Sequence, residues 1–125
     1  MEEMSFAWKI FKMSHKKILL ISVPEPPPKD EGILVTECLL DWINGRNDIN
    51  PEIKKKAIRL IQARDNYGFQ KYGQHLRTGD GRDDIEDAAQ EIGDAMQYVM
   101  KAILNNRNTK PIADMVNVLV LLLSR

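Results

Sequence analysis

The amino-acid sequence predicts an all-α fold, a bundle of about four helices that follows an N-terminal arm and a proline-rich linker. Three observations lead to this expectation. After the linker, apolar residues recur throughout at the spacing of one helix face. Residues typical of helix ends separate these periodic segments. The 125 residues are enough for one domain with a modest core, with or without a short appendage.

Residues 1–32 form the predicted arm and linker, and residues 33–125 form the predicted helical domain. The linker sequence Pro-Glu-Pro-Pro-Pro-Lys-Asp is typical of extended chain. The arm before it contains a short apolar run that fits a strand only if it finds a partner, so a docked arm and a disordered arm both remain open. The basic segment Lys9 to Lys17 is a weak candidate for contact with a membrane surface or a nucleic acid.

The first two predicted helices have recognisable ends. An amphipathic helix covers residues 33–43 and is closed by the Asn-Gly pair that follows. Asn50 is expected to cap the second helix, with Pro51 in its first turn. The apolar periodicity of this helix runs to about Tyr72.

The third helix is expected to start at Asp83, which forms a capping box with Glu86, and to end near residue 105. Antiparallel packing of the second and third helices is expected through the connection at residues 73–82. Thr109 precedes a fourth helix that is apolar nearly all round and must therefore be buried. Because a small domain offers little room, we expect this helix to lie at a subunit interface.

A row of acids is the most distinctive feature of the third helix. Asp84, Asp87, Glu91 and Asp94 follow one another at spacings of three, four and three, and Tyr98 extends the row. At about 100° per residue they share one side of the helix. Like charges at this spacing repel each other. A hard divalent cation is the obvious means of offsetting that repulsion.

The second helix supplies one more acid. Asp65 lies on a stripe where helix geometry predicts an apolar residue, and a carboxylate in a helix seam is costly unless it is paired or bound to metal. If the two helices are antiparallel neighbours, Asp65 faces Glu91 and Asp94. Carboxylates from two helices suit Mg²⁺, which commonly bridges to substrate phosphates and generates a hydroxide nucleophile.

Composition excludes several other classes. Lysine plus arginine and aspartate plus glutamate both number 18, so the zero net charge predicts neither nucleic acid nor membrane as the main partner. One cysteine and two histidines make a disulfide or a structural zinc site improbable. We find neither a membrane-spanning run nor a signal peptide, which favours a cytoplasmic location.

Residues 58–104 carry a resemblance to a known family. The shared elements are a Lys-Tyr-Gly motif, a Gly-Arg-Asp motif and a Glu-x-x-Asp motif, at Lys71-Tyr72-Gly73, Gly81-Arg82-Asp83 and Glu91…Asp94, with Arg64, Asp65, Gly68, Leu76, Asp87, Ala88, Gln90 and Tyr98 around them. This string resembles the MazG-like all-α nucleoside triphosphate pyrophosphohydrolases, and is closest to the small forms of phages and other viruses.

The resemblance implies Mg²⁺-dependent cleavage of a (deoxy)nucleoside triphosphate into monophosphate and pyrophosphate, with Mn²⁺ as a possible substitute. It also implies a homodimer or homotetramer that acts in the cytoplasm, including the cytoplasm of a virus- or phage-infected host cell. The family pattern has EExxE on one helix, but residues 61–65 read Ile-Gln-Ala-Arg-Asp, so only Asp65 is acidic. The number of bound metals is therefore open.

Roles follow residue by residue from this resemblance and from the acid row. The predicted metal ligands are Asp65, Asp87, Glu91 and Asp94; the catalytic residues are Asp87 and Glu91; the substrate-binding residues are Lys71, Tyr72, Arg82 and Tyr98.

Plainer interpretations stand beside these roles. Acidic rows often form solvated helix faces, Lys71 and Arg82 suit ordinary ion pairs, and the two tyrosines suit packing. The missing acids also favour a second hypothesis, a catalytically inactive homologue that serves as an oligomeric binding or scaffold module.

Overall fold

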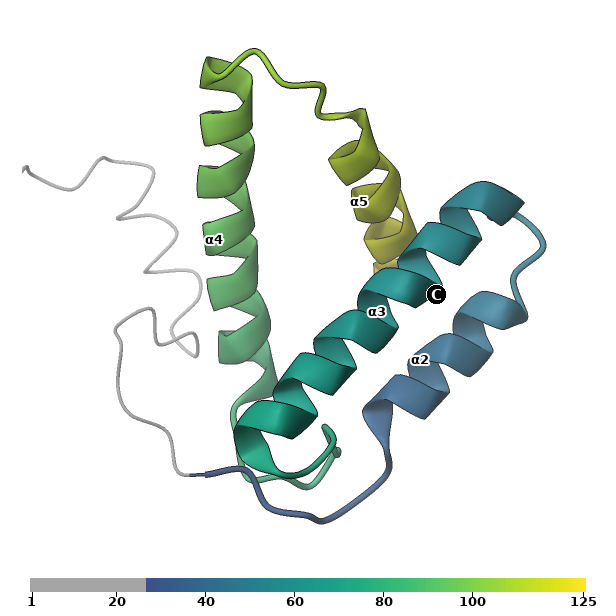
Figure 1. Cartoon of the computed structure of the whole chain (residues 1–125). Coiled ribbons are helices and arrows are strands. Elements are labelled where there is room, and N and C mark those ends of the chain that lie inside the picture. The colour runs from purple at the N-terminus through teal and green to yellow at the C-terminus, as the bar shows by residue number, and fades with distance from the viewer. Residues whose placement is uncertain (1–26) are drawn as a thin grey trace, which may run out of the picture.

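The computed structural model describes residues 27–125. The predictions for the N-terminal arm, including the basic segment Lys9 to Lys17, concern residues outside this range. The described part contains four helices and no β-sheet: α2 (Val35–Asn44), α3 (Pro51–Tyr72), α4 (Asp84–Leu104) and α5 (Lys110–Leu123) (Figure 1). The expected all-α class is therefore confirmed for this part of the chain.

The ends of the helices follow from local sequence. The Asn50 side chain accepts hydrogen bonds from two backbone N–H groups in the first turn of α3. Gly73 ends the same helix with a φ of 74°, a left-handed conformation that glycine adopts at little cost. Asp83 caps α4 by accepting from the Glu86 N–H at 3.0 Å. The Glu86 carboxylate itself accepts from Gln90 at 3.1 Å.

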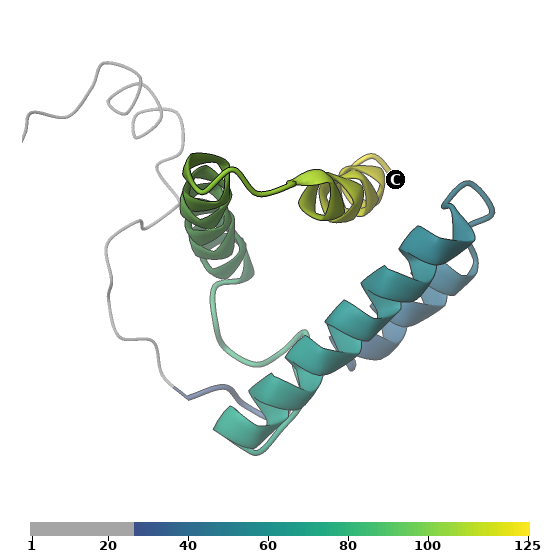
Figure 2. The same cartoon turned by 45° about the horizontal axis from the view of Figure 1, so that its top comes forward.

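The core lies where α3 meets α2 on one side and α5 on another. Figures 1 and 2 both show α2 and α3 running side by side. The buried apolar residues are Ile43, Ile49, Ala57 and Val118, and among the residues packed against them are Leu39, Trp42, Ile53, Ile58, Ile61 and Met115. This small core joins the first and last of the described helices, because Ile43 belongs to α2 and Val118 to α5.

Helix α4 does not pack along α3, and the expected antiparallel pair is absent from the described residues. The two helices diverge from their connection (Figure 1). That connection, residues 73–83, is a long loop and not a tight hairpin.

The apolar sides of α4 and α5 stay exposed within one chain. On α4, Ile85, Met96 and Ile103 are all more than half exposed. Of the α5 side chains, Val118 is buried at 9% exposure, whereas Val120 is 50% exposed. The expected burial of α5 is therefore only partly met by the chain itself.

Residues 27–34 form an extended segment, with bends at Asp30 and Gly32, along the loop at residues 74–80. Val35 N–H donates to the Leu76 carbonyl at 3.0 Å, and Thr78 N–H donates to the Ile33 carbonyl at 3.0 Å. Lys29 N–H donates to the Asp80 carbonyl at 2.8 Å. These bonds attach the end of the predicted linker to the helical domain.

None of the helices in residues 27–125 is long and apolar enough to cross a membrane.

Candidate functional site

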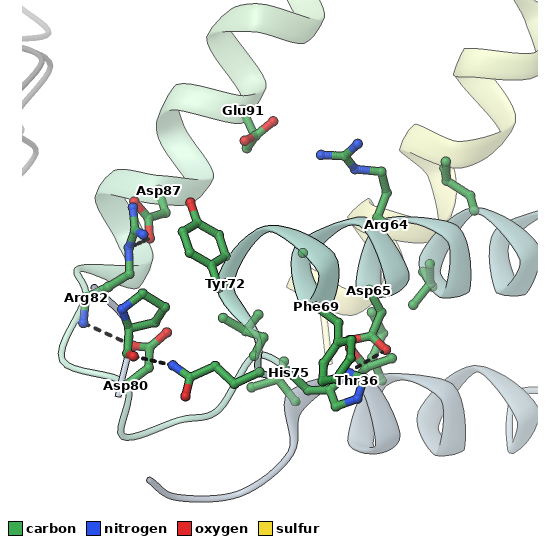
Figure 3. A pocket seen from close by; sticks show the side chains of 18 of the residues that line it. Thr36, Arg64, Asp65, Phe69, Tyr72, His75, Asp80, Arg82, Asp87 and Glu91 are labelled. Atoms are coloured by element: carbon green, nitrogen blue, oxygen red, sulfur yellow. Dashed lines mark hydrogen bonds and ion pairs between the residues drawn. The ribbon is translucent and has the colours of Figure 1, made fainter. Parts of the chain in front are cut away.

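A pocket of about 780 Å³ opens between α2, α3, the first turns of α4 and the loop that joins α3 to α4. Its size falls in the range of small-molecule sites, about 300–1,000 Å³. The lining combines aliphatic and aromatic side chains with acids and arginines (Figure 3). The charged residues of the lining are Arg64, Asp65, Asp80, Arg82, Asp87 and Glu91.

Asp65 is turned toward α2 and not toward α4. Its Oδ1 atom accepts a hydrogen bond from the Thr36 hydroxyl at 3.2 Å and lies 3.0 Å from His75 Nδ1. Since a carboxylate can only accept, His75 Nδ1 must carry the hydrogen. His75 in turn stacks on Phe69, with ring centroids 4.6 Å apart. The expected meeting of Asp65 with Glu91 and Asp94 is therefore corrected: local partners already satisfy this carboxylate.

Arg82 enters the pocket from the loop before α4. Its Nε atom lies 3.6 Å from Asp87 Oδ2, and its guanidinium carbon lies 5.5 Å from the centre of the Tyr72 ring. Asp80, only 7% exposed, accepts from the Arg82 backbone N–H at 3.0 Å and so forms a turn that fixes the start of the Arg82 side chain. Tyr72, Arg82 and Asp87 thus form one connected group.

The Tyr72 phenol is electrostatically altered by its neighbours. A hydrogen bond from Arg82 lowers its pKa from the usual value, burial acts in the opposite sense, and Lys71 adds to the lowering. Both cations favour the ionised phenol because it is negatively charged. Tyr72 therefore reports on the positive potential at this end of the pocket.

Glu91 and Arg64 face each other from different helices. Figure 3 shows the Arg64 guanidinium extending from α3 toward α4 on the side of Glu91, away from the Asp65 carboxylate. Both residues line the pocket. Within residues 27–125, Glu91 forms no ion pair. Its carboxylate is therefore available to a ligand.

The pocket brings together five of the eight residues predicted from sequence: Asp65, Tyr72, Arg82, Asp87 and Glu91. The other three, Lys71, Asp94 and Tyr98, are exposed and lie outside the lining. Lys71 stays close, with its Nζ atom 5.2 Å from the Tyr72 ring centre. Tyr98 is 70% exposed on α4.

The carboxylates do not form a ready-made metal cage. In the described part of the chain, no group of three or more His, Cys, Asp or Glu side chains could hold an ion. Asp65 is engaged by His75, and Asp87 is paired with Arg82. Glu91 lines the same pocket as Asp87 and forms no ion pair in the described residues.

Sequence reasoning missed several lining residues, namely Thr36, Arg64, Phe69, His75 and Asp80. Asp80 lies in the connection expected at residues 73–82, and an aspartate in a turn commonly bonds the backbone two residues on. That rule could have found Asp80. The pairing of Asp65 with His75 depends on the path of the loop after Gly73, for which the sequence has no local pattern.

Comparison of the chain with known protein families, with curated proteins and with solved structures finds no match. Any function for this pocket therefore depends on the sequence resemblance and on the geometry described above.

Proposed function

We propose that this chain hydrolyses (deoxy)nucleoside triphosphates to the monophosphate and pyrophosphate, with magnesium bound to the nucleotide. One observation carries the proposal: Glu91 and Asp87 share a nucleotide-sized pocket with two arginines and a stacked aromatic pair. Arginine suits phosphate oxygens, and aromatic rings suit a nucleobase. The resemblance of residues 58–104 to MazG-like enzymes points to the same chemistry.

Each end of the pocket has a role in this proposal. Arg82 binds the phosphate chain, and Tyr72 lies beside it. The stacked rings of Phe69 and His75 offer a surface for the base at the other end. Asp65 fixes the His75 ring through the contact at 3.0 Å. Magnesium, held by Glu91 and Asp87, supplies charge neutralisation when it is bound.

Hydrolysis requires a water molecule to lose a proton while its oxygen bonds to the α-phosphorus. The bond from that phosphorus to the bridging oxygen breaks, and pyrophosphate leaves with the electron pair. Glu91 is the proton acceptor in this proposal, through the carboxylate oxygen that would not hold the metal. Asp87 positions the Arg82 guanidinium through the contact at 3.6 Å. Such an activity belongs in the cytoplasm, where its substrates are found.

The direct test incubates the full chain with each nucleoside and deoxynucleoside triphosphate and Mg²⁺, and resolves the products by ion-exchange chromatography. We expect monophosphate and pyrophosphate in equal amounts. Replacing Glu91→Gln should lower the rate about 100-fold or more, the usual contribution of a general base. The control is Glu37→Gln, an exposed acid on α2 outside the pocket. If no nucleotide yields monophosphate at micromolar protein, the proposal is wrong.

The engagement of Asp65 by His75 and Thr36 favours a second candidate, an inactive module that binds a ligand in the same pocket. With Asp65 engaged in this way, α3 has no pocket-lining carboxylate left that could act in catalysis. Calorimetry with a nucleotide, with and without Mg²⁺, separates the two. An inactive scaffold should show no Mg²⁺-dependent nucleotide binding, and its function should survive Glu91→Gln.

A further inference from the structure

Arg64 extends into the pocket from a position of α3 to which the sequence assigned no role. Figure 3 shows its guanidinium on the Glu91 side of the helix, opposite in direction to the neighbouring Asp65 carboxylate. The guanidinium carbon lies 4.5 Å from the centre of the Tyr67 ring, a contact that supports the side chain without neutralising it. In the part of the chain that the structure describes, Arg64 forms no ion pair.

On α3 itself no free carboxylate adjoins Arg64, and Glu91, which faces it from α4, forms no ion pair with it in the described residues. The turn of α3 that precedes it carries Ile61 and Gln62, neither of which is negatively charged, and Ile61 lines the pocket. The carboxylate next to it in the sequence, Asp65, is engaged by His75 at 3.0 Å. On the facing wall, Arg82 lines the same pocket from the loop before α4. Two guanidinium groups thus reach one cavity from different elements.

We propose that Arg64 is a polyphosphate-binding residue that acts with Arg82 across the pocket. The assignment rests on the proposed function, since it names how α3 holds the triphosphate. A guanidinium binds phosphate oxygens through paired N–H donors, which favours arginine over lysine at such a site. Arg64 therefore supplies from α3 a direct positive charge on the phosphate chain, since residues 27–125 contain no acid cluster that could hold a second cation.

The test measures binding of inorganic tripolyphosphate to the full chain by calorimetry, in EDTA and without any divalent cation. The wild-type chain should bind, and Arg64→Gln should raise Kd about tenfold or more, the usual loss for a charge-assisted hydrogen bond. Arg64→Lys should bind with intermediate affinity because it keeps the charge without the paired donors. Circular dichroism of each variant checks that the helices remain.

The matched control is Arg59→Gln, an exposed arginine of the same helix that does not line the pocket. It should change Kd less than about twofold, since a single exposed charge outside the site is screened. Three outcomes would each overturn the assignment. Arg64→Gln could have the same Kd as the wild type, Arg59→Gln could weaken binding as much as Arg64→Gln, or the wild-type chain could fail to bind.

Failure of this inference is distinguishable from failure of the proposed function. One outcome refutes only the role of Arg64: Glu91→Gln abolishes nucleotide hydrolysis, and Arg64→Gln leaves the Kd for tripolyphosphate unchanged. Arg64-dependent binding by a chain that hydrolyses no nucleotide refutes the enzyme and supports the role of Arg64 in a binding module.

Discussion

Tyr72 lies between two cations, with the Arg82 guanidinium carbon 5.5 Å and the Lys71 Nζ atom 5.2 Å from its ring centre. The hydrogen bond from Arg82 is the largest cause of its lowered pKa. Removing that donor should therefore raise the pKa. We expect Arg82→Gln to shift the ionisation of Tyr72 to higher pH, measured as alkaline ultraviolet difference spectra of each protein against its Tyr72→Phe counterpart.

The lowered pKa of Tyr72 also determines how its ionisation changes the free energy of unfolding with pH. A phenol whose pKa is lower in the folded chain contributes its full stabilisation above its unfolded pKa, about 10. That stabilisation is lost as the pH falls through the folded pKa. Arg59→Gln is the control for the spectroscopic measurement and should leave the midpoint of the Tyr72 ionisation unchanged. An unchanged midpoint in Arg82→Gln would show that Arg82 does not act on this phenol.

Single residues also show where sequence reasoning reaches its limit. Glu91 and Asp87 were placed on one helix face by spacing alone, and both line the pocket. Asp94 has the same spacing and does not, because the pocket ends at the first turns of α4. Helix periodicity determines which side a residue takes, whereas the extent of a pocket depends on how far apart two helices lie. That distance has no local pattern in the sequence.

At the scale of elements, the loop of residues 74–80 depends on a close approach at Gly32. This glycine has a φ of 94°, and a Cβ atom there would lie 2.6 Å from the Gly79 nitrogen and still closer to the Thr78 hydroxyl. Gly32→Ala should therefore lower the free energy of unfolding by about 1–3 kcal/mol, the usual cost of such backbone strain. Urea unfolding followed by circular dichroism measures the change.

Gly93→Ala is the matched control for this substitution. Gly93 lies within α4, and a Cβ atom there would meet nothing within 4 Å. In a helix interior, alanine is more stabilising than glycine by about 1 kcal/mol. The control should therefore raise the stability while Gly32→Ala lowers it. A stabilising Gly32→Ala would mean that the extended segment can move away from the loop at no cost.

Local signals were sufficient for the helices themselves. The cap at Asn50 and the left-handed Gly73 delimit α3 as its sequence predicts, because caps act through hydrogen bonds within one turn. The expected packing of α3 on α4 was wrong for one chain. That expectation treated the connection as a hairpin, whereas its residues are bound instead to the segment at 27–35.

At the scale of the whole molecule, the apolar side of α4 lacks a partner within the described residues. Ile92 is 48% exposed and Met96 is 65% exposed, one turn apart on that side. Exposed apolar patches of this kind mark association surfaces. We expect the chain to sediment at equilibrium as a dimer or tetramer, as its resemblance to MazG-like proteins implies.

A paired substitution tests this assembly. Ile92→Glu with Met96→Glu should reduce the sedimenting mass to about that of one chain, because burying two carboxylates in an apolar interface is costly. Gln62→Glu, an exposed polar position on α3 outside the pocket, is the control and should keep the wild-type mass. A wild-type chain that is monomeric at all concentrations tested would contradict the expectation.

The extended segment that borders the pocket loop has a practical consequence for handling the protein. A protease cut between residues 29 and 33 would loosen the backbone bonds that hold this segment against residues 78–80, and we expect the helices to stay intact because the cut lies outside all of them. Helical content is therefore a poor measure of whether a preparation has a competent binding site. Intact mass is the better criterion, since it registers a nick that spectroscopy of the helices would pass over.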